Sequence, residues 1–307
     1  MKTYPDCYSC FMRQALEAAR FSGLDEEATR DVLQRVGAEI AEFEPQMRPP
    51  EMGARIHGLV RTLSGVEDPY RHVKERSTES ALALLDDLRA RVRGGKASSD
   101  DGSLYTAVLL AVIGNIMDYG MLDADAVEQR LFALLREEQK TVEQESNAFF
   151  QLEELSAALA SAQSMLYVAD NAGETVFDRV LLEEIRRRYP KLDVVYAVRG
   201  RPILNDATEA DAREAGLQHV ARLVSSGCDA PGTVLERCDE SFLELLGASD
   251  LVLSKGQGNY ESLSDSFAAS KTFFLLMAKC DVVARDVGCS PGDVLLLPGS
   301  SGTPRPG

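Results

Sequence analysis

The sequence predicts an α/β protein, with a Rossmann-like, mainly parallel sheet covered by helices on both faces and an all-helical N-terminal domain. Apolar residues recur at helical spacing through the first half of the chain, whereas short apolar runs alternate with helical patterns from about residue 165. Such alternation is typical of parallel sheets, because each connection crosses one face of the sheet. We therefore expect a helical domain at 1–160, an α/β domain at 161–298 and a loose Pro/Gly/Ser-rich tail at 299–307.

Capping and turn residues divide the helical half into segments. Gly23 is placed to end a first helix, and Asp25 to begin a second. Proline is tolerated in the first turn of a helix, so Pro49-Pro50 and Pro69 each predict a helix start. We expect helices at 8–21, 25–40, from 49 onward, 69–93, 104–117, 124–138 and 148–160, and a flexible Gly-, Ser- and Asp-rich loop at 94–102.

The second half contains short apolar runs that end in polar residues, each followed by a helical pattern. This order predicts parallel strands joined by crossover helices. We expect strands at 165–169, 193–198, 218–224, 251–254, 272–276 and 294–297, and helices at 175–189, 203–215 and 241–246.

The composition excludes several kinds of partner. Asp and Glu (49) outnumber Lys and Arg (33), so the formal net charge is −16, and such a surface repels nucleic acid and anionic membranes. No apolar run approaches the roughly 20 residues that span a bilayer. Residues 1–6 lack the apolar core of a secretory signal, and the six cysteines are too scattered for a disulfide framework. We expect a cytoplasmic protein.

Oxygen-bearing side chains follow the first two predicted strands. Asp170 and Asn171 end the first, and Asp206 follows the second, 36 residues after Asp170. Ligands of open α/β sheets bind beyond the carboxyl ends of the strands, so these side chains are expected to meet there. Two carboxylates and an amide oxygen suit a hard cation such as Mg²⁺ or Mn²⁺. Helix capping by Asp170 or Asn171, and a first-turn position for Asp206, are the plainer interpretations.

Residues around these positions are suited to a phosphate group. The helix that starts at Thr175 presents free N–H groups, and Glu174 is either a general acid/base or a first-turn acid. Arg199 and Arg201 would hold a phosphate, or else form surface ion pairs. A third strand end carries a positive charge beside glycines that let a ligand approach the backbone, although a simple turn is the alternative and no Walker loop is present: Lys255, Gly256, Gly258 and Asn259.

Two further pairs of residues share a helix face. Cys7 and Cys10 are spaced as half of a metal site or as a redox pair, or are ordinary thiols. Asn115 and Asp118 lie on an otherwise apolar helix and must find polar partners, either a substrate in the cleft or an interdomain hydrogen bond.

These motifs resemble those of the metal-dependent damage-control phosphatases, a family first catalogued as a domain of unknown function. The likeness lies in Asp-Asn-Ala-Gly-Glu at 170–174, Leu-Asn-Asp at 204–206 and Lys-Gly-Gln-Gly-Asn-Tyr-Glu at 255–261, and extends to 7–10, 68–70 and 114–120. Met117 and Tyr119 stand where the family pattern has Ile and Phe. The chain most resembles the prokaryotic branch with the N-terminal Cys pair. The resemblance implies metal ligation by Asp170, Asn171 and Asp206, hydrolysis of small phosphorylated metabolites such as sugar phosphates, and a helical domain packed on a Rossmann-like one.

We therefore expect a metal-dependent phosphatase that uses Mn²⁺, Co²⁺, Ni²⁺ or Mg²⁺, with catalytic roles for Asp170, Glu174 and Lys255. Spacing leaves open whether Asp170 is only a ligand or also attacks phosphorus. Two alternatives stay open. One is a methyltransferase that uses S-adenosylmethionine, and the other is a non-catalytic protein that binds phosphometabolites.

Overall fold

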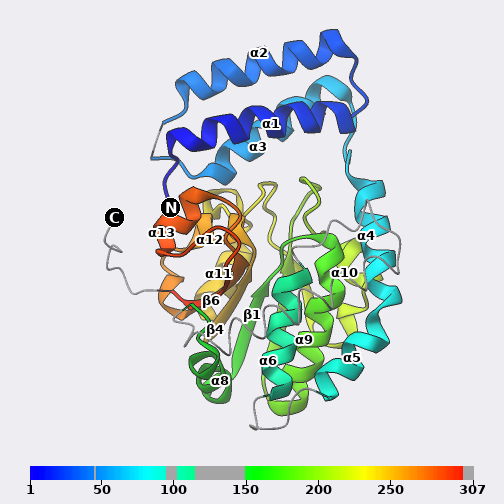
Figure 1. Ribbon diagram of the computed structural model, residues 1–307, viewed down its shortest axis with the longest axis vertical. Coiled ribbons are helices and arrows are strands. Elements are labelled where there is room, and N and C mark those ends of the chain that lie inside the picture. Colours follow the sequence, from blue (N-terminus) through cyan, green and yellow to red (C-terminus); the bar gives the residue numbers. More distant parts are fainter. Residues whose placement is uncertain (45, 95–101, 115–148, 300–307) are drawn as a thin grey trace.

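The structure, a computed structural model, describes residues 1–44, 46–94, 102–114 and 149–299. A six-stranded sheet in the order β3-β2-β1-β4-β5-β6 forms its centre (Figure 1). The pairs from β3 through β5 are parallel, and β6 runs antiparallel to β5. The predicted α/β class with a mainly parallel sheet is confirmed. The strands are β1 (Ser164–Val168), β2 (Asp193–Val198), β3 (Arg222–Ser225), β4 (Leu251–Lys255), β5 (Thr272–Met277) and β6 (Val294–Pro298).

Helices cover both faces of this sheet, because neighbouring residues of each strand point to opposite sides. Tyr167 and Leu253 belong to the core on one face, whereas Leu166 and Val252 belong to the core on the other. The first face is covered by α5 (Leu85–Arg93), α6 (Gly102–Ile113), α8 (Leu152–Ser161), α9 (Thr175–Arg188) and α10 (Glu209–Glu214), and the second by α11 (Glu240–Ala248), α12 (Gln257–Leu263) and α13 (Asp281–Val287).

Three N-terminal helices form a separate layer beyond one end of the sheet (Figure 1). They are α1 (Pro5–Phe21), α2 (Glu26–Glu42) and α3 (Pro49–Ser64), and they share a core that includes Phe11, Val32 and Met52. Arg61 on α3 donates to the carbonyl oxygen of Pro202 over 2.9 Å, in the segment that follows β2. This layer therefore lies over the carboxyl ends of the strands. α4 (Arg71–Ala83) connects it to the helices beside the sheet.

The strand order reverses direction beside β1, which places a topological switch point at its carboxyl end. β2 and β3 lie on one side of β1, and β4 and β5 on the other. The crevice at such a point is where open α/β sheets bind ligands. The residues that follow β1, β2 and β4 converge there.

Several predicted boundaries were wrong. The helix predicted at 203–215 begins only at Glu209, because Thr208 and Asp211 form a capping box that starts α10 there. The strand predicted at 218–224 is β3, shortened by a 3₁₀ turn at Leu217–His219. The helix predicted at 69–93 is broken at Leu84 into α4 and α5, and α12 and α13 were not predicted.

Parts of the domain prediction are not tested by the structure. The helix predicted at 124–138, most of the loop at 94–102 and nearly all of the tail at 299–307 lie outside the described residues. The predicted domain boundary at residue 160 stays a prediction. α5 and α6 precede this boundary, yet their side chains share a core with the sheet. In the described part of the chain, no helix has the length and apolar character needed to cross a membrane.

Candidate active site

Asp170 and Asn171 follow β1 and meet Asp206 through a backbone bridge. Asn171 and Asp206 form an isolated antiparallel bridge outside the sheet. Beside it, the Ala207 N–H donates to the carbonyl oxygen of Asp170 over 2.7 Å. These contacts join two segments that are 36 residues apart in sequence. Asp206 therefore lies in this bridge rather than in the first turn of a helix, so the plainer interpretation of Asp206 was wrong.

The bridge gathers buried acidic side chains at the switch point. Asp170, Glu174 and Asp206 are 9%, 1% and 3% exposed. Burial raises the pKa of Asp170 to about 7, and repulsion from the carboxylates of Glu174 and Asp206 adds to the shift. Burial also raises the pKa of Asp206. The site thus concentrates negative charge in a place that water solvates poorly.

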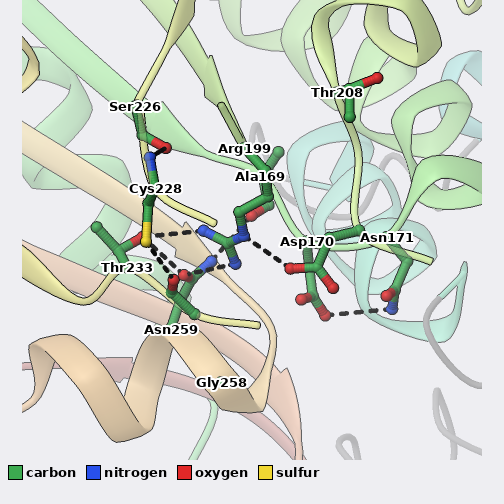
Figure 2. Close-up of polar contacts among 12 residues, drawn as sticks. Ala169, Asp170, Asn171, Arg199, Thr208, Ser226, Cys228, Thr233, Gly258 and Asn259 are labelled. Atoms are coloured by element: carbon green, nitrogen blue, oxygen red, sulfur yellow. Dashed lines mark hydrogen bonds and ion pairs between the residues drawn. The ribbon is translucent and has the colours of Figure 1, made fainter. Parts of the chain in front are cut away.

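The Asn171 amide is oriented by these carboxylates. Its Nδ2 donates to Glu174 Oε1 over 2.6 Å and to Asp170 Oδ2 over 3.3 Å, and Figure 2 shows Asp170 and Asn171 side by side at the strand end. A carboxylate only accepts hydrogen bonds, so it fixes the amide with its NH₂ group toward Glu174 and its oxygen directed elsewhere. Asn171 is the N-cap residue of the 3₁₀ turn at Ala172–Glu174, and its side chain accepts no capping hydrogen bond there, so helix capping does not explain it.

Gly256 allows the carboxylate of Asp170 to lie against the backbone at the end of β4. A Cβ atom at this position would lie 2.0 Å from Asp170 Oδ2. The φ angle of Gly256 is +82°, a conformation that side chains with a Cβ rarely adopt. Any other residue here would displace Asp170. The sequence predicted that Gly256 would let a ligand approach the backbone. In the structure the group that lies against this glycine is the side chain of Asp170.

Arg199 ties the loops after β2 and β4 to Asp206. Its Nε donates to Asp206 Oδ2 over 2.7 Å, and its Nη atoms donate to Thr233 Oγ1 over 3.1 Å and to Asn259 Oδ1 over 3.0 Å (Figure 2). Asn259 in turn donates to the carbonyl oxygens of Ala169 and Lys255. Arg199 and Asp206 are both buried, so this is a charge-assisted pair shielded from solvent.

Lys255, the last residue of β4, forms ion pairs with the carboxylates of Glu174 and Asp178. Its Nζ is 2.8 Å from Glu174 Oε2 and 2.8 Å from Asp178 Oδ1, and its side chain is fully buried. Asp178 also accepts hydrogen bonds from the Tyr167 and Tyr196 hydroxyls, over 2.6 and 2.7 Å. The sequence predicted that the Lys255 ammonium group would contact a phosphoryl group. In the structure it pairs with two carboxylates of the protein instead.

Asp178, Tyr167, Tyr196 and Thr233 were missed by sequence reasoning. One signal was available for Asp178, because Glu174 and Asp178 stand four residues apart and share a helix face. The two tyrosines face each other across the β1–β2 pair, a register that the sequence does not reveal.

Some predicted site residues lie apart from this group. Arg201 is half exposed and pairs with Glu67 over 2.5 and 3.0 Å, which is the surface pairing left open as its alternative. A Cβ atom at Gly258 would lie 2.0 Å from the carbonyl oxygen of Pro231, so this glycine admits a neighbouring loop. Asn115 and Asp118 lie outside the described residues.

Cys7 and Cys10 lie on α1 and are free thiols, one half-buried and the other exposed. Burial raises the pKa of the Cys7 thiol. Within the described ranges, no group of three or more His, Cys, Asp or Glu side chains is arranged to hold a metal ion. A metal or redox role for Cys7 and Cys10 stays a prediction.

Comparison with known proteins extends over almost the whole chain. The family model of the damage-control phosphatase ARMT1-like domain matches residues 3–295. A damage-control phosphatase of Archaeoglobus fulgidus is 36% identical over 299 residues, which is 96% of this chain and 98% of the relative. An uncharacterised protein of Methanocaldococcus jannaschii, MJ0202, is 35% identical over 97% of this chain and 95% of its own length.

The fold is also that of a solved relative. The crystal structure of PH1575, a DUF89 family protein from Pyrococcus horikoshii, superposes with a TM-score of 0.86 at 28% identity and covers 98% of this chain and 100% of the other. The assignment to the branch with the N-terminal Cys pair stays a prediction. The family that the motifs indicated is confirmed, and this chain belongs to the damage-control phosphatase ARMT1-like domain family.

Proposed function

We propose that this protein is a metal-dependent phosphatase that hydrolyses small phosphorylated metabolites at the site around Asp170, Asn171 and Asp206. Phosphatase activity is supported by the relatives from Archaeoglobus fulgidus and Pyrococcus horikoshii, both named damage-control phosphatases. The observation that carries the proposal is the backbone bridge that joins Asp170 and Asn171 to Asp206 at the switch point of the sheet.

The donor set fits a hard divalent cation. Asp170 and Asp206 contribute carboxylate oxygens, and Asn171 contributes the amide oxygen that its hydrogen bond to Glu174 leaves free. Mg²⁺ and related ions keep several waters and substrate oxygens, so three protein oxygens suffice. The raised pKa of Asp170 supports the fit, because a cation would offset the repulsion among the buried carboxylates. We propose Mn²⁺, Co²⁺, Ni²⁺ or Mg²⁺ as the cofactor.

A divalent cation bound there would act as a Lewis acid on the phosphoryl group and supply a nucleophile at neutral pH. The protein's own residues hold the geometry. Arg199 fixes one oxygen of Asp206, which leaves the other oxygen for ligation. Glu174 orients Asn171, and Lys255 holds Glu174. Glu174 and Lys255 are therefore positioning residues in this proposal, since each is engaged by the other.

Phosphate release in the presence of each cation tests the proposal. Wild type should hydrolyse members of a sugar phosphate panel with at least one of the four cations. Asp170→Asn and Asp206→Asn should each lower kcat/KM by about 100-fold or more, because the loss of a ligand removes several kcal/mol of transition-state stabilisation. Asp31→Asn is the matched control, since Asp31 is exposed on α2 and forms an ion pair with Arg35 on the same helix.

Three results would contradict the proposal. Equal rates in wild type and the two site variants would remove these residues from the reaction. Binding of a phosphate ester in calorimetry without turnover by any cation would favour a phosphometabolite-binding protein. Binding of S-adenosylmethionine without a metal would favour a methyltransferase.

A further inference from the structure

A buried lysine on α4 connects the N-terminal half of the chain to the helix that follows Asp206. Lys74 Nζ lies 2.9 Å from Asp68 Oδ2 and 3.2 Å from Asp211 Oδ2. The side chains of Lys74, Asp68 and Asp211 are 4%, 7% and 11% exposed. Asp68 belongs to the loop between α3 and α4, and Asp211 belongs to α10. One ammonium group therefore holds together two acidic residues from distant parts of the chain.

The carboxylate of Asp211 also caps α10. Its Oδ2 accepts hydrogen bonds from the Thr208 backbone N–H over 2.7 Å and from Thr208 Oγ1 over 2.6 Å. Lys74 donates to the same oxygen. A buried carboxylate that loses its cation keeps a desolvated charge, which favours its movement toward solvent. Lys74 thus stabilises the capping box that starts α10.

The position of this cap determines what the residues before it can do. The sequence at 203–208 has a helical pattern, yet α10 begins only at Glu209. In the residues before the cap, Ala207 donates to the carbonyl oxygen of Asp170, and Asp206 bridges to Asn171. An α10 extended toward its N-terminus would use these backbone groups for its own hydrogen bonds. The cap at Thr208 therefore keeps the Asp206 segment free to form the bridge.

The helix that carries Lys74 contacts both sides of the bridge. α4 packs against α10 and against the 3₁₀ turn at Ala172–Glu174 (Figure 1). That turn includes Glu174, which accepts the hydrogen bond that orients the Asn171 amide. A change at Lys74 is therefore transmitted to Asp206 through the cap, beside the turn that orients Asn171.

We propose that Lys74 is a positioning residue for the metal site, acting through Asp211 and Thr208 on the segment that carries Asp206. The inference rests on the proposed function, which puts a divalent cation at Asp170, Asn171 and Asp206. Lys74 itself touches neither the cation nor the substrate in this proposal. Because Asp68 lies in the loop that leaves the layer of α1–α3, the same ammonium group also connects that layer to the reactive end of the sheet.

The affinity for Mn²⁺, measured by calorimetry, tests this role without depending on turnover. Lys74→Met keeps the length of the side chain and removes its charge. It should weaken Mn²⁺ binding by about fivefold to tenfold, as expected for coupling through a chain of packed contacts. Saturating Mn²⁺ should return kcat close to the wild-type value, because the cation then holds Asp206 in place.

Lys271→Met is the matched control. Lys271 donates to the carbonyl oxygens of Gly247 and Ser249, beside the amino end of β5 and so at the opposite end of the sheet from the metal site. This substitution removes an equally engaged ammonium group, and it should leave the Mn²⁺ affinity unchanged. An equal loss of affinity in both variants would show that Lys74 contributes only general stability, which would overturn the positioning role.

A double variant tests the route through Asp211. Lys74→Met and Asp211→Asn act on one contact, so Lys74→Met/Asp211→Asn should lose no more Mn²⁺ affinity than the weaker-binding single variant. A loss equal to the product of the two single losses would overturn this route.

Thr208→Val carries the test if Lys74→Met does not fold. It removes the hydroxyl group that donates to Asp211 and should weaken Mn²⁺ binding by about twofold to fivefold. Wild-type affinity in a folded Lys74→Met, or in Thr208→Val, would overturn the positioning role while the phosphatase proposal stands. A wild type that binds none of the four cations and hydrolyses no ester would overturn the proposed function and this inference with it.

Discussion

Replacing Lys255 by methionine would leave two carboxylates buried without their counter-ion. Lys255 Nζ lies 2.8 Å from both Glu174 and Asp178, and the three side chains are 0%, 2% and 0% exposed. Removing one partner of a buried ion pair costs about 3–5 kcal/mol, because the remaining charge stays desolvated. Methionine has a similar length and fills the same space, so the loss of packing is small.

This free energy corresponds to a measurable change in melting temperature. The unfolding entropy is about 2.1 cal/mol/K per residue, or about 0.6 kcal/mol/K for a chain of this length. Lys255→Met should therefore lower Tm by about 5–8 °C. Lys191→Met, which alters an exposed lysine after α9, is the matched control and should change Tm by less than about 1 °C.

The decrease in stability caused by Lys255→Met, called the deficit below, should also depend on pH. Burial already raises the pKa of Asp178 while Lys255 opposes the shift, so removal of the lysine raises that pKa further. A carboxyl group with a raised pKa in the folded state binds its proton more readily there than in the unfolded chain. The deficit is therefore full at neutral pH and shrinks as the pH falls toward the ordinary carboxyl pKa of about 4.

Thermal unfolding followed by circular dichroism at about pH 5.5 and about pH 7.5 measures both effects. A Lys255→Met variant that melts within about 1 °C of wild type would refute the assignment of a buried ion pair. A deficit of the same size at both pH values would refute the role of the carboxylates.

Three further predictions concern the candidate site. Gly256→Ala should bind Mn²⁺ more weakly than wild type in calorimetry, because the added Cβ would crowd Asp170. Gly288→Ala is the control and should keep the wild-type affinity, since Gly288 has a similar φ of +85° and a Cβ there would meet no atom within 4 Å. Equal affinities in the two variants would contradict the crowding. Arg199→Lys keeps the charge but loses two buried hydrogen bonds to neutral partners, so kcat/KM in a phosphate-release assay should fall by about 30- to 100-fold, and an unchanged value would show that the network is dispensable. Mn²⁺ at about 100 times its Kd should raise Tm by about 4 °C, as expected for about 2.7 kcal/mol of binding free energy, and a chelator or Asp206→Asn should abolish the shift. A flat Tm in wild type would speak against a metal site.

The sequence was sufficient where a local pattern determines the structure. The run at 193–198 is buried on both faces of the sheet from Val194 onward, and its prediction as a strand matches β2 to the residue. Asp170 and Asp206 were expected to meet because parallel strands bring their carboxyl ends to one edge, and the backbone bridge confirms their proximity. Both inferences use only periodicity and the general geometry of α/β sheets.

The remainder depends on tertiary contacts that have no local signature. Residues 203–206 carry a helical pattern, yet the bridge to Asn171 overrides it, with Leu204 in a positive φ conformation. Lys255 carries a charge suited to phosphate, yet the β1–β2 register and the first turns of α9 bring Asp178 and Glu174 to it instead. Propensity and motif spacing report what a residue can do, whereas its partners are set by segments far away in the chain.

The bridge between Asn171 and Asp206 has a consequence for how this fold changes over time. Main-chain pairing does not depend on which side chain occupies a position, so the separation of the oxygens it carries is insulated from mutation in the surrounding loops. If the proposed metal site is correct, residues in the loops around it can change during evolution while the positions of Asn171 and Asp206 are kept. We therefore expect paralogues that catalyse the same reaction on different substrates.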